Sequence, residues 1–393
     1  MTRWSLILTL CLAAACSSVA PGAAPPPNSA GSQSAPSSPA AVAAPTAPSA
    51  PPGAPSLAGD HATGAPAASG TNPYLPAPGE APVNVNAATC AVTGGFVQFY
   101  TALDNGIFQK YGMNVQHTVI RSSGAALAAM TSGEIQFLYC AAAAVIPGMA
   151  SGIEAKIVAD PLQGLPYVMI ARPDVHTMTD LRGKSLAITR PGDLDDLVSR
   201  QALEHFGLKP NEDVQLRPIG GSQPERYQAL LANIVQGIAI TPPLDAQARK
   251  DGMNVIYQLS DLNVPFVYSA VEAPNRVIRE NPQLVQRFVA AIAEGVYFTE
   301  KNPEVARASL RKVLDLDDPE ALDSAYDAYA RKLVNRRMTT AFEAVNDIIQ
   351  EARADGTAVT VSGAADIATN QFTDDLERTG FLQQLWGAEL PPR

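Results

Sequence analysis

Two short stretches of this 393-residue chain resemble each other: TSGEIQFLYC at residues 131–140 and LANIVQGIAIT at residues 231–241. In each stretch a segment of helical character ends, a glutamine follows an Ile or Val, and an apolar run begins. The glutamines are Gln136 and Gln236, and each apolar run is typical of a buried strand. We call this connection from the end of a helix to a strand a joint. Its repetition predicts that the chain consists of two similar halves, each of which contains one joint.

The residues before the first joint alternate short apolar runs with helical spacing. AATCAVT (87–93) predicts a strand, and the helix after it carries large apolar residues on one face and ends at the Asn-Gly pair 105–106. YGMNVQHTVIR (111–121) predicts a second strand, and SSG (122–124) opens a helix that Gly133 ends. Strands separated by helices of this length predict βαβ units in a parallel sheet.

The same pattern precedes the second joint. SLAIT (185–189) and VQLRPI (214–219) predict strands, and a capping box with Ser222 and Glu225 opens the helix that leads to the third strand. Each half is therefore expected to contain three strands in the same order. Most of the remainder is expected to be helical. The alternating charges of DPEALDSAYDAYARKL (318–333) predict a solvated helix face.

The N-terminus has the layout of an export signal. In MTRWSLILTLCLAAAC, Arg3 precedes an apolar segment too short to span a bilayer, and small residues precede Cys16. This layout predicts a signal peptide over residues 1–15 and resembles a bacterial lipobox, in which Cys16 becomes lipidated. Ordinary cleavage at an Ala-x-Ala site is the alternative.

Residues 16–85 are expected to form a lipid-anchored tether. Nearly all of this stretch up to about residue 70 is Ala, Pro, Ser and Gly, a composition that cannot offset its ordering entropy. After residue 16 there is no apolar run long enough to span a bilayer. The formal net charge of −10 argues against sequence-independent binding to nucleic acid.

Several motifs, in their order and spacing, carry a family resemblance. They are DNGIFQKYGMNV (104–115), SSGAALAAMTSGEI (122–135), DLRGKSLAIT (180–189), ALEHFGLKPNEDVQL (202–216), TPPLDAQARKDGMNV (241–255) and FTDDLERTGFL (372–382). The chain resembles the periplasmic solute-binding proteins of ABC importers, in the nitrate, sulfonate and taurine group that includes NMT1/THI5-like proteins. In that family an Asp often stands where this chain has Gln136 and Gln236, and we expect both glutamines to serve turn geometry.

The resemblance implies an α/β chain with the type II periplasmic-binding-protein fold, in which two βαβ lobes are joined by a two-segment hinge. Lobe 1 would comprise residues 86–170 plus 270–393, and lobe 2 residues 173–266. PYVMIAR (166–172) and VPFVYSAV (264–271) would form the hinge.

The same resemblance implies the function of an exported substrate-binding lipoprotein, held at the cell membrane on the periplasmic or outer side. It would capture a small polar organic solute in the interlobe cleft and deliver it to a permease and its ATPase. Sulfonate, taurine-like and pyrimidine-like solutes are the expected classes. We expect a monomer with no cofactor, no metal and no nucleic-acid partner.

The candidate ligand-binding residues follow the predicted strands, because ligands of open parallel sheets bind beyond the carboxyl ends of the strands, at helix N-termini. The alternatives are turn geometry for the glycines, an N-cap role for Ser122 and a core position for Phe96. Tyr167 and Tyr268 are further candidates near the hinge. The candidates are Gly94, Gly95, Phe96, Ser122, Ser123, Cys140, Ala141, Arg190, Gly192, Asp193, Thr241 and Pro242.

Arg190 stands close in sequence to Asp193 and Asp195. A site for a bare oxyanion would lack neighbouring carboxylates, whereas a ligand with an amine or a ring N–H would use them. This mixed set favours a taurine-like or aminopyrimidine-like ligand over nitrate.

Two cysteines of the mature chain, Cys90 and Cys140, lie at or near the ends of the first and third predicted strands. Such strands are usually adjacent, and an exported compartment is oxidising, so a disulfide is sterically conceivable. The alternative is two small buried apolar side chains.

Some relatives of this fold are enzymes of pyrimidine synthesis for thiamine, which consume a histidine and use a Cys-rich motif, and this is the alternative function. None of the four histidines lies on a predicted ligand-facing loop, and the chain has no metal-ligand spacing, nucleophile elbow or phosphate loop. We therefore expect no catalysis. The histidines are His61, His117, His176 and His205.

Overall fold

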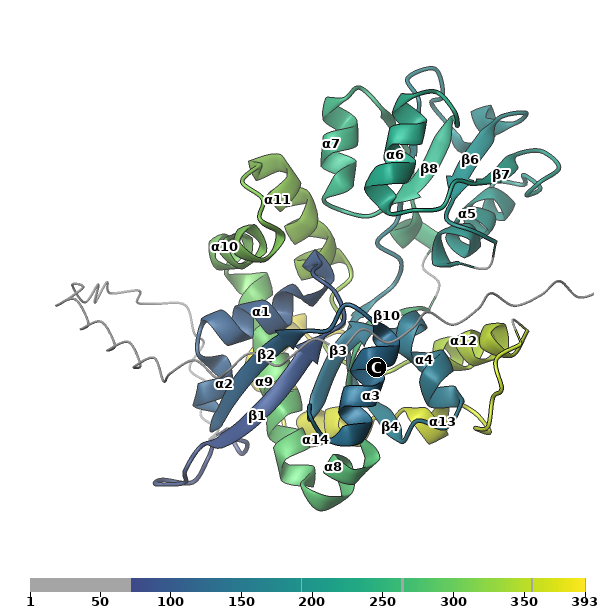
Figure 1. Cartoon of the computed structure of the whole chain (residues 1–393). Coiled ribbons are helices and arrows are strands. Elements are labelled where there is room, and N and C mark those ends of the chain that lie inside the picture. The colour runs from purple at the N-terminus through teal and green to yellow at the C-terminus, as the bar shows by residue number, and fades with distance from the viewer. Residues whose placement is uncertain (1–71, 192, 263–264, 355, 393) are drawn as a thin grey trace, which may run out of the picture. The chain divides into compact units, whose positions relative to one another are not determined.

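The computed structural model describes residues 72–191, 193–262, 265–354 and 356–392 (Figure 1). The predicted signal peptide, the lipidation site Cys16 and most of the predicted tether lie outside these residues. Within them the chain forms two five-stranded sheets, and no described helix has both the length and the hydrophobicity needed to cross a membrane.

The first sheet has the strand order β2-β1-β3-β10-β4. β2, β1 and β3 run parallel, as the βαβ pattern predicts, whereas β10 runs antiparallel to both β3 and β4. The predicted βαβ units are therefore present, and the sheet is mixed because β10 joins it from a later part of the chain. The strands are β1 (Val83–Thr89), β2 (Met113–Val119), β3 (Phe137–Ala141), β4 (Ala155–Gln163) and β10 (Val267–Pro274).

The second sheet repeats this plan with the order β7-β6-β8-β5-β9. β7, β6 and β8 are parallel, and β5 runs antiparallel between β8 and β9. The prediction of three equivalent strands in each half is confirmed. The strands are β5 (Val168–Ala171), β6 (Ser185–Ile188), β7 (Gln215–Pro218), β8 (Gly237–Ile240) and β9 (Asn254–Gln258).

The two glutamines perform the same structural task in each half. Gln136 Oε1 accepts a hydrogen bond from Asn86 N at 2.8 Å, and Gln136 N donates to Asn86 O at 2.8 Å. Gln236 Oε1 accepts from Ser185 N at 3.1 Å, and its own N–H donates to Ser185 O at 2.9 Å. Gln136 thus joins the start of β3 to the middle of β1, and Gln236 joins the start of β8 to the start of β6. Each glutamine also bonds back to the turn before it, since Gln136 Nε2 donates to Gly133 O at 3.1 Å and Gln236 Nε2 donates to Asn233 Oδ1 at 3.4 Å, in agreement with the expected role in turn geometry.

The fold begins before the predicted boundary at residue 85. β1 starts at Val83, and Tyr74 is buried with its ring edge against Phe381, at 5.3 Å between centroids. The Tyr74 hydroxyl also lies 2.9 Å from Asp375 Oδ2 and 2.7 Å from Thr379 Oγ1. Residues 72–82 belong to the folded part, because an aromatic side chain there finds partners near the C-terminus.

The lobe boundaries also differ from the prediction. β5 belongs to the second sheet and β10 to the first, so lobe 1 of the described chain comprises 72–163 and 267–392, and lobe 2 comprises 168–262. The predicted hinge segments are therefore mostly strand. The described crossing residues are 164–167 and 265–266, and Gly164 N donates to Phe266 O at 2.8 Å between them.

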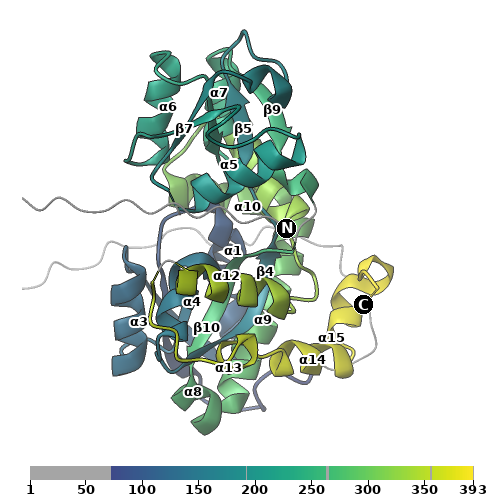
Figure 2. The ribbon, with the colours of Figure 1, turned by 90° about the vertical axis from the view of Figure 1, so that its right-hand side faces the viewer.

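Helices cover both faces of the first sheet. One core joins α1, α9 and α14 to the sheet, and there Phe288 of α9 stacks on Phe137 at 3.8 Å between centroids. The other core joins α3, α4 and α12, on the side that faces the viewer in Figure 2. The helices of lobe 1 are α1 (Val97–Asp104), α2 (Ile107–Lys110), α3 (Ser123–Ser132), α4 (Ala142–Ala150), α8 (Asn275–Glu280), α9 (Pro282–Lys301), α10 (Pro303–Leu314), α11 (Pro319–Asp327), the π-helical η4 (Ala328–Lys332), α12 (Phe342–Ala354), α13 (Ala364–Ile367), α14 (Gln371–Arg378) and α15 (Phe381–Trp386).

The helices of lobe 2 follow the predicted signals. The capping box of Ser222 and Glu225 is present at the start of α6, and Gly207 lies in the left-handed region just after α5. The helices are α5 (Leu194–His205), α6 (Gln223–Leu231) and α7 (Leu244–Lys250).

Two carboxyl groups are fully buried in lobe 1. Asp160 of β4 accepts one hydrogen bond, from Gln163 Nε2 at 3.0 Å, and Glu272 of β10 has no ion-pair or side-chain hydrogen-bond partner among the described residues. Burial raises the pKa of each carboxyl group well above its ordinary value. Burial therefore favours the protonated form of each group over its charged form.

We predict that Glu272→Gln flattens the pH dependence of stability. Because the folded pKa is raised, this group contributes stability that is full below pH about 4 and is lost as the pH rises through its folded pKa. The free energies of unfolding of the variant and the native chain are measured by urea denaturation. The variant's value minus the native value should increase as the pH rises, with a limiting slope on the order of 1.4 kcal/mol per pH unit.

The exposed Glu343 on α12 supplies the control, because Glu343→Gln changes a carboxylate without changing the buried pair. Parallel pH profiles for the native chain and Glu272→Gln would contradict the prediction.

Candidate ligand-binding site

The loop after β1 is built around two glycines. Thr93 Oγ1 accepts a hydrogen bond from Gly95 N at 3.3 Å, and Gly95 O accepts one from Ser269 Oγ of β10 at 3.2 Å. A Cβ on Gly94 would lie 2.8 Å from the ring of Tyr329. Close approach of that ring, rather than a positive φ, therefore explains why glycine is needed at position 94.

The other lobe 1 candidates lie in different settings. Phe96 is in the core, 5.0 Å from the Tyr139 ring, so the core interpretation holds for this residue. Ser122 is exposed and caps α3 by accepting from Ala125 N at 3.3 Å, and Ser123 is the first residue of that helix. Cys140 is buried and forms a disulfide with Cys90, and Ala141 is half-buried at the start of α4.

The charged residues of lobe 2 satisfy one another. Arg190 is exposed and its Nε lies 2.9 Å from Asp193 Oδ1. Asp195 is buried, accepts from Thr189 N at 2.7 Å, and pairs with Arg226 of α6 at 3.3 Å. Gly192 lies outside the described residues. The mixed charge set predicted from the sequence thus consists of two neutralised pairs.

Gln223 organises the loop after β8. Its Oε1 accepts hydrogen bonds from Thr241 N at 3.0 Å and from Thr241 Oγ1 at 3.2 Å. This contact ties the first turn of α6 to the carboxyl end of β8, so both elements present one surface. Gln223 was not among the candidates predicted from the sequence, although its place directly after the N-cap Ser222 was a usable signal.

The two lobes share a cavity of about 370 Å³, which these loops line. Of the predicted residues, Gly94, Thr241 and Pro242 line it, whereas Gly95, Phe96, Ser122, Ser123, Cys140, Ala141, Arg190 and Asp193 do not. Its volume falls in the range of roughly 300–1,000 Å³ that is typical of small-molecule sites. The lining consists of Val92, Thr93, Gly94, Gln223, Pro224, Thr241, Pro242, Pro243, Leu244, Gln247, Leu314, Leu316, Asp318 and Ala321.

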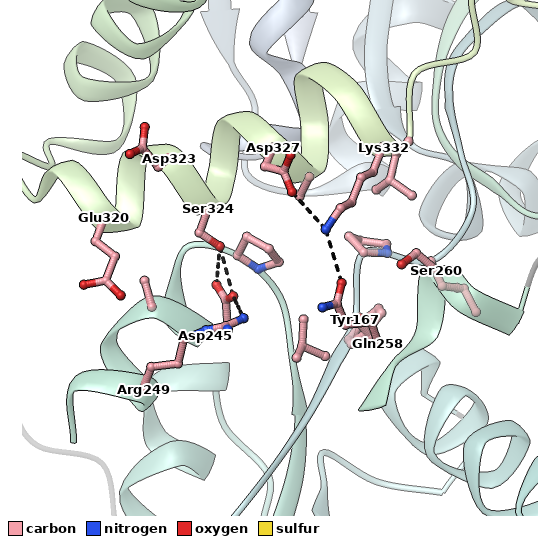
Figure 3. Close-up of a pocket in the computed structure, with 17 residues that line it drawn as sticks. Tyr167, Asp245, Arg249, Gln258, Ser260, Glu320, Asp323, Ser324, Asp327 and Lys332 are labelled. Carbon is pink, nitrogen blue, oxygen red and sulfur yellow. Dashed lines mark hydrogen bonds and ion pairs between the residues drawn. The ribbon is translucent and has the colours of Figure 1, made fainter. Parts of the chain in front are cut away.

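A second cavity, of about 390 Å³, lies beside the hinge between α7 of lobe 2 and the α11–η4 segment of lobe 1 (Figure 3). Tyr167 lines it, whereas Tyr268 lines neither cavity. The Ser324 hydroxyl of α11 donates to both carboxylate oxygens of Asp245, at 2.7 and 2.9 Å. The prediction of a solvated face for residues 318–333 is therefore wrong on the side that contacts lobe 2.

Three histidines lie in the described part of the chain, and none lines either cavity. His117 pairs with Thr89 Oγ1 at 3.0 Å, and burial lowers its pKa. His176 contacts the side chain of Asn254, and His205 stacks near Tyr257. Among the described residues, no group of three or more His, Cys, Asp or Glu side chains is placed to hold a metal ion.

Two lobes with one strand order, joined by paired crossings and sharing a cavity at the carboxyl ends of their strands, are the architecture of the periplasmic-binding-protein fold. Solved structures share this fold. A putative sulfonate-binding protein SsuA from Methylobacillus flagellatus KT superimposes with a TM-score of 0.60 over 79% of this chain and 97% of that chain, at 18% identity.

The family follows from the sequence comparisons. The model of the NMT1/THI5-like family matches residues 94–306, more than half of the chain. A putative binding protein of Brucella abortus (strain 2308) is 30% identical over 220 residues, which cover 55% of this chain and 67% of the relative. The riboflavin-binding protein RibY of Chloroflexus aurantiacus is 26% identical over 220 residues, which cover 54% and 60%. The chain belongs to the NMT1/THI5-like family.

We predict that Gly94→Ala destabilises the fold by about 1–3 kcal/mol, because the new methyl group collides with the fully buried ring of Tyr329. The measurement is the free energy of unfolding from urea titration.

Gly124→Ala in the first turn of α3 is the matched control. Its Cβ would meet only Ser122 Oγ at 3.9 Å, and alanine stabilises a helix relative to glycine by up to about 1 kcal/mol. Equal stability of the two variants would contradict the close approach at Gly94.

Proposed function

We propose that this chain is the solute-binding component of an ABC importer and that its ligand occupies the cavity shared by the loops after β1 and β8. The observation that carries the proposal is that one cavity is lined by Thr93 and Gly94 of lobe 1 and by Gln223 and Thr241 of lobe 2. A ligand that contacts both lobes stabilises the arrangement in which the lobes lie close together. A permease that recognises this arrangement then receives loaded protein in preference to empty protein.

The charges at the site favour a ligand with no net charge. Among the described residues, Asp318 is the one charged residue in the lining of the cavity, and its carboxylate pairs with Lys250 of α7, so this charge is already compensated. The cavity offers hydroxyl and amide groups from Thr93, Thr241 and Gln247 beside prolines and leucines. This set suits a zwitterion such as a taurine-like molecule, or a polar heterocycle such as a pyrimidine, better than a simple alkanesulfonate.

The export of the protein is part of the same proposal. The signal-like residues 1–15, a lipid on Cys16 and the Ala/Pro/Ser-rich stretch that follows would hold the binding domain at the outer side of the cell membrane as a monomer. The sulfonate- and riboflavin-binding relatives support a transport role over the alternative of pyrimidine synthesis on the same fold.

We predict that one ligand class raises the melting temperature of the protein and that Gln223→Ala weakens its binding about tenfold. Loss of the amide releases Thr241 from its hydrogen bonds and loosens one wall of the cavity. A thermal-shift panel of taurine, alkanesulfonates, pyrimidines and flavins identifies the class, and isothermal titration calorimetry then gives the dissociation constants.

Gln228→Ala is the control, because this exposed glutamine lies on the same helix and does not line the cavity. Equal losses of affinity in the two variants would place the ligand elsewhere. The absence of stabilisation by any compound, together with no small molecule in mass spectra of the purified protein, would argue against the proposed function itself.

A further inference from the structure

The α11–η4 segment of lobe 1 makes a row of contacts with lobe 2 beside the hinge. Ser324 donates to Asp245 of α7, and five residues later the Tyr329 hydroxyl donates to Pro242 O at 3.1 Å. Lys332 Nζ lies 3.3 Å from Gln258 Oε1 of β9 (Figure 3). In a further contact the donor lies on lobe 2: Lys250 of α7 pairs with Asp318, the N-cap of α11 in lobe 1.

The centre of this row is buried. Asp245 is only 2% exposed, and its carboxylate is shared by Ser324 and by Arg249 at 3.1 Å. A buried carboxylate that loses a hydrogen-bond donor bears much of its desolvation cost without compensation. Separation of α11 from α7 therefore costs more than the loss of an exposed surface contact.

Tyr329 connects this row to the ligand cavity. Its ring lies against Gly94, which lines the cavity from lobe 1, and stacks on Tyr268 of β10 at 6.1 Å between centroids. Its hydroxyl reaches Pro242, which lines both cavities from lobe 2. Burial raises the pKa of Tyr329 well above its ordinary value, so the hydroxyl remains a hydrogen-bond donor.

The local backbone explains this position. The segment 328–332 is π-helical, and Gln98 of α1 donates its amide to Tyr329 O at 2.6 Å. A π-helical turn releases backbone carbonyls from the regular helix pattern, and such turns are frequent at functional sites. The Tyr329 backbone is thus anchored to lobe 1 while its hydroxyl binds lobe 2.

We infer that the α11–η4 segment is a third connection between the lobes, in addition to the two hinge crossings, and that Tyr329 is a positioning residue that links the arrangement of the lobes to the ligand cavity. The link follows from contact: movement of Pro242 away from Tyr329 opens the cavity wall that Pro242 and Thr241 form opposite Gly94. The link to the cavity rests on the proposed function, whereas the third connection does not.

The test compares two double variants of the full chain. Tyr329→Phe with Ser324→Ala removes two donors to lobe 2, whereas Tyr326→Phe with Ser309→Ala removes a tyrosine hydroxyl bonded to Glu300 O and a serine bonded to Asp104, both within lobe 1. Each substitution deletes a hydroxyl and leaves the surrounding packing almost unchanged. The pair therefore separates interlobe effects from general loss of stability.

The readout is the interlobe distance distribution without ligand. Spin labels on p-acetylphenylalanine at the exposed positions Glu204 of α5 and Glu343 of α12 report it by pulsed electron double resonance and involve no cysteine. In the native chain the two labels have a main interlobe distance. We expect the first double variant to lower the ratio of molecules at this distance to molecules at other distances by roughly tenfold or more, and the second to leave the distribution unchanged. Amide exchange at Leu244, which donates to Thr241 O, should accelerate only in the first.

An unchanged distance distribution in the Tyr329 and Ser324 variant, or an equal change in both variants, would overturn the third connection. A changed distribution with unaltered exchange at Leu244 would overturn the link to the cavity. Because neither measurement uses a ligand, these failures are distinguishable from failure of the ligand panel.

Discussion

The first strand after each crossing lies inside the sheet that the chain enters, and this placement holds the two lobes together. β5 follows lobe 1 in the sequence but lies between β8 and β9, and β10 follows lobe 2 but lies between β3 and β4. Each crossing strand is therefore hydrogen-bonded on both sides, within a sheet rather than at its edge. Among the described residues, only 164–167 and 265–266 pass between the two sheets.

Local signals predicted much of this architecture. Ser222 and Glu225 form their capping box, Ser122 caps α3, and Gly133 takes the left-handed conformation at the end of that helix. Contacts within a few residues determine each of these features, so a single sequence carries the necessary information. The equivalence of the two halves was predicted from the same kind of signal. In each half a helix ends, an Ile or Val precedes a glutamine (Gln136 or Gln236), and an apolar strand follows.

Features that depend on distant partners were not predictable in this way. The apolar run of β5 has the same pattern whichever sheet it joins, so the assignment of the crossing strands required the tertiary structure. Tyr74 stands beside an Ala- and Pro-rich segment, and its partner Asp375 is 301 residues away. Of the candidate site residues, Gly94, Thr241 and Pro242 meet at one cavity. The contribution of α11 was missed because its charge alternation resembles that of any solvated helix.

The way the N-terminal residues join lobe 1 has a mechanical consequence. Asn72–Glu80 attach near the amino end of β1, where Tyr74 bonds to α14 and Glu80 pairs with Arg287 of α9. The cavity-lining loops lie at the opposite, carboxyl ends of the strands. A pulling force on Asn72 therefore enters the molecule through lobe 1, at the end of its sheet opposite the cavity.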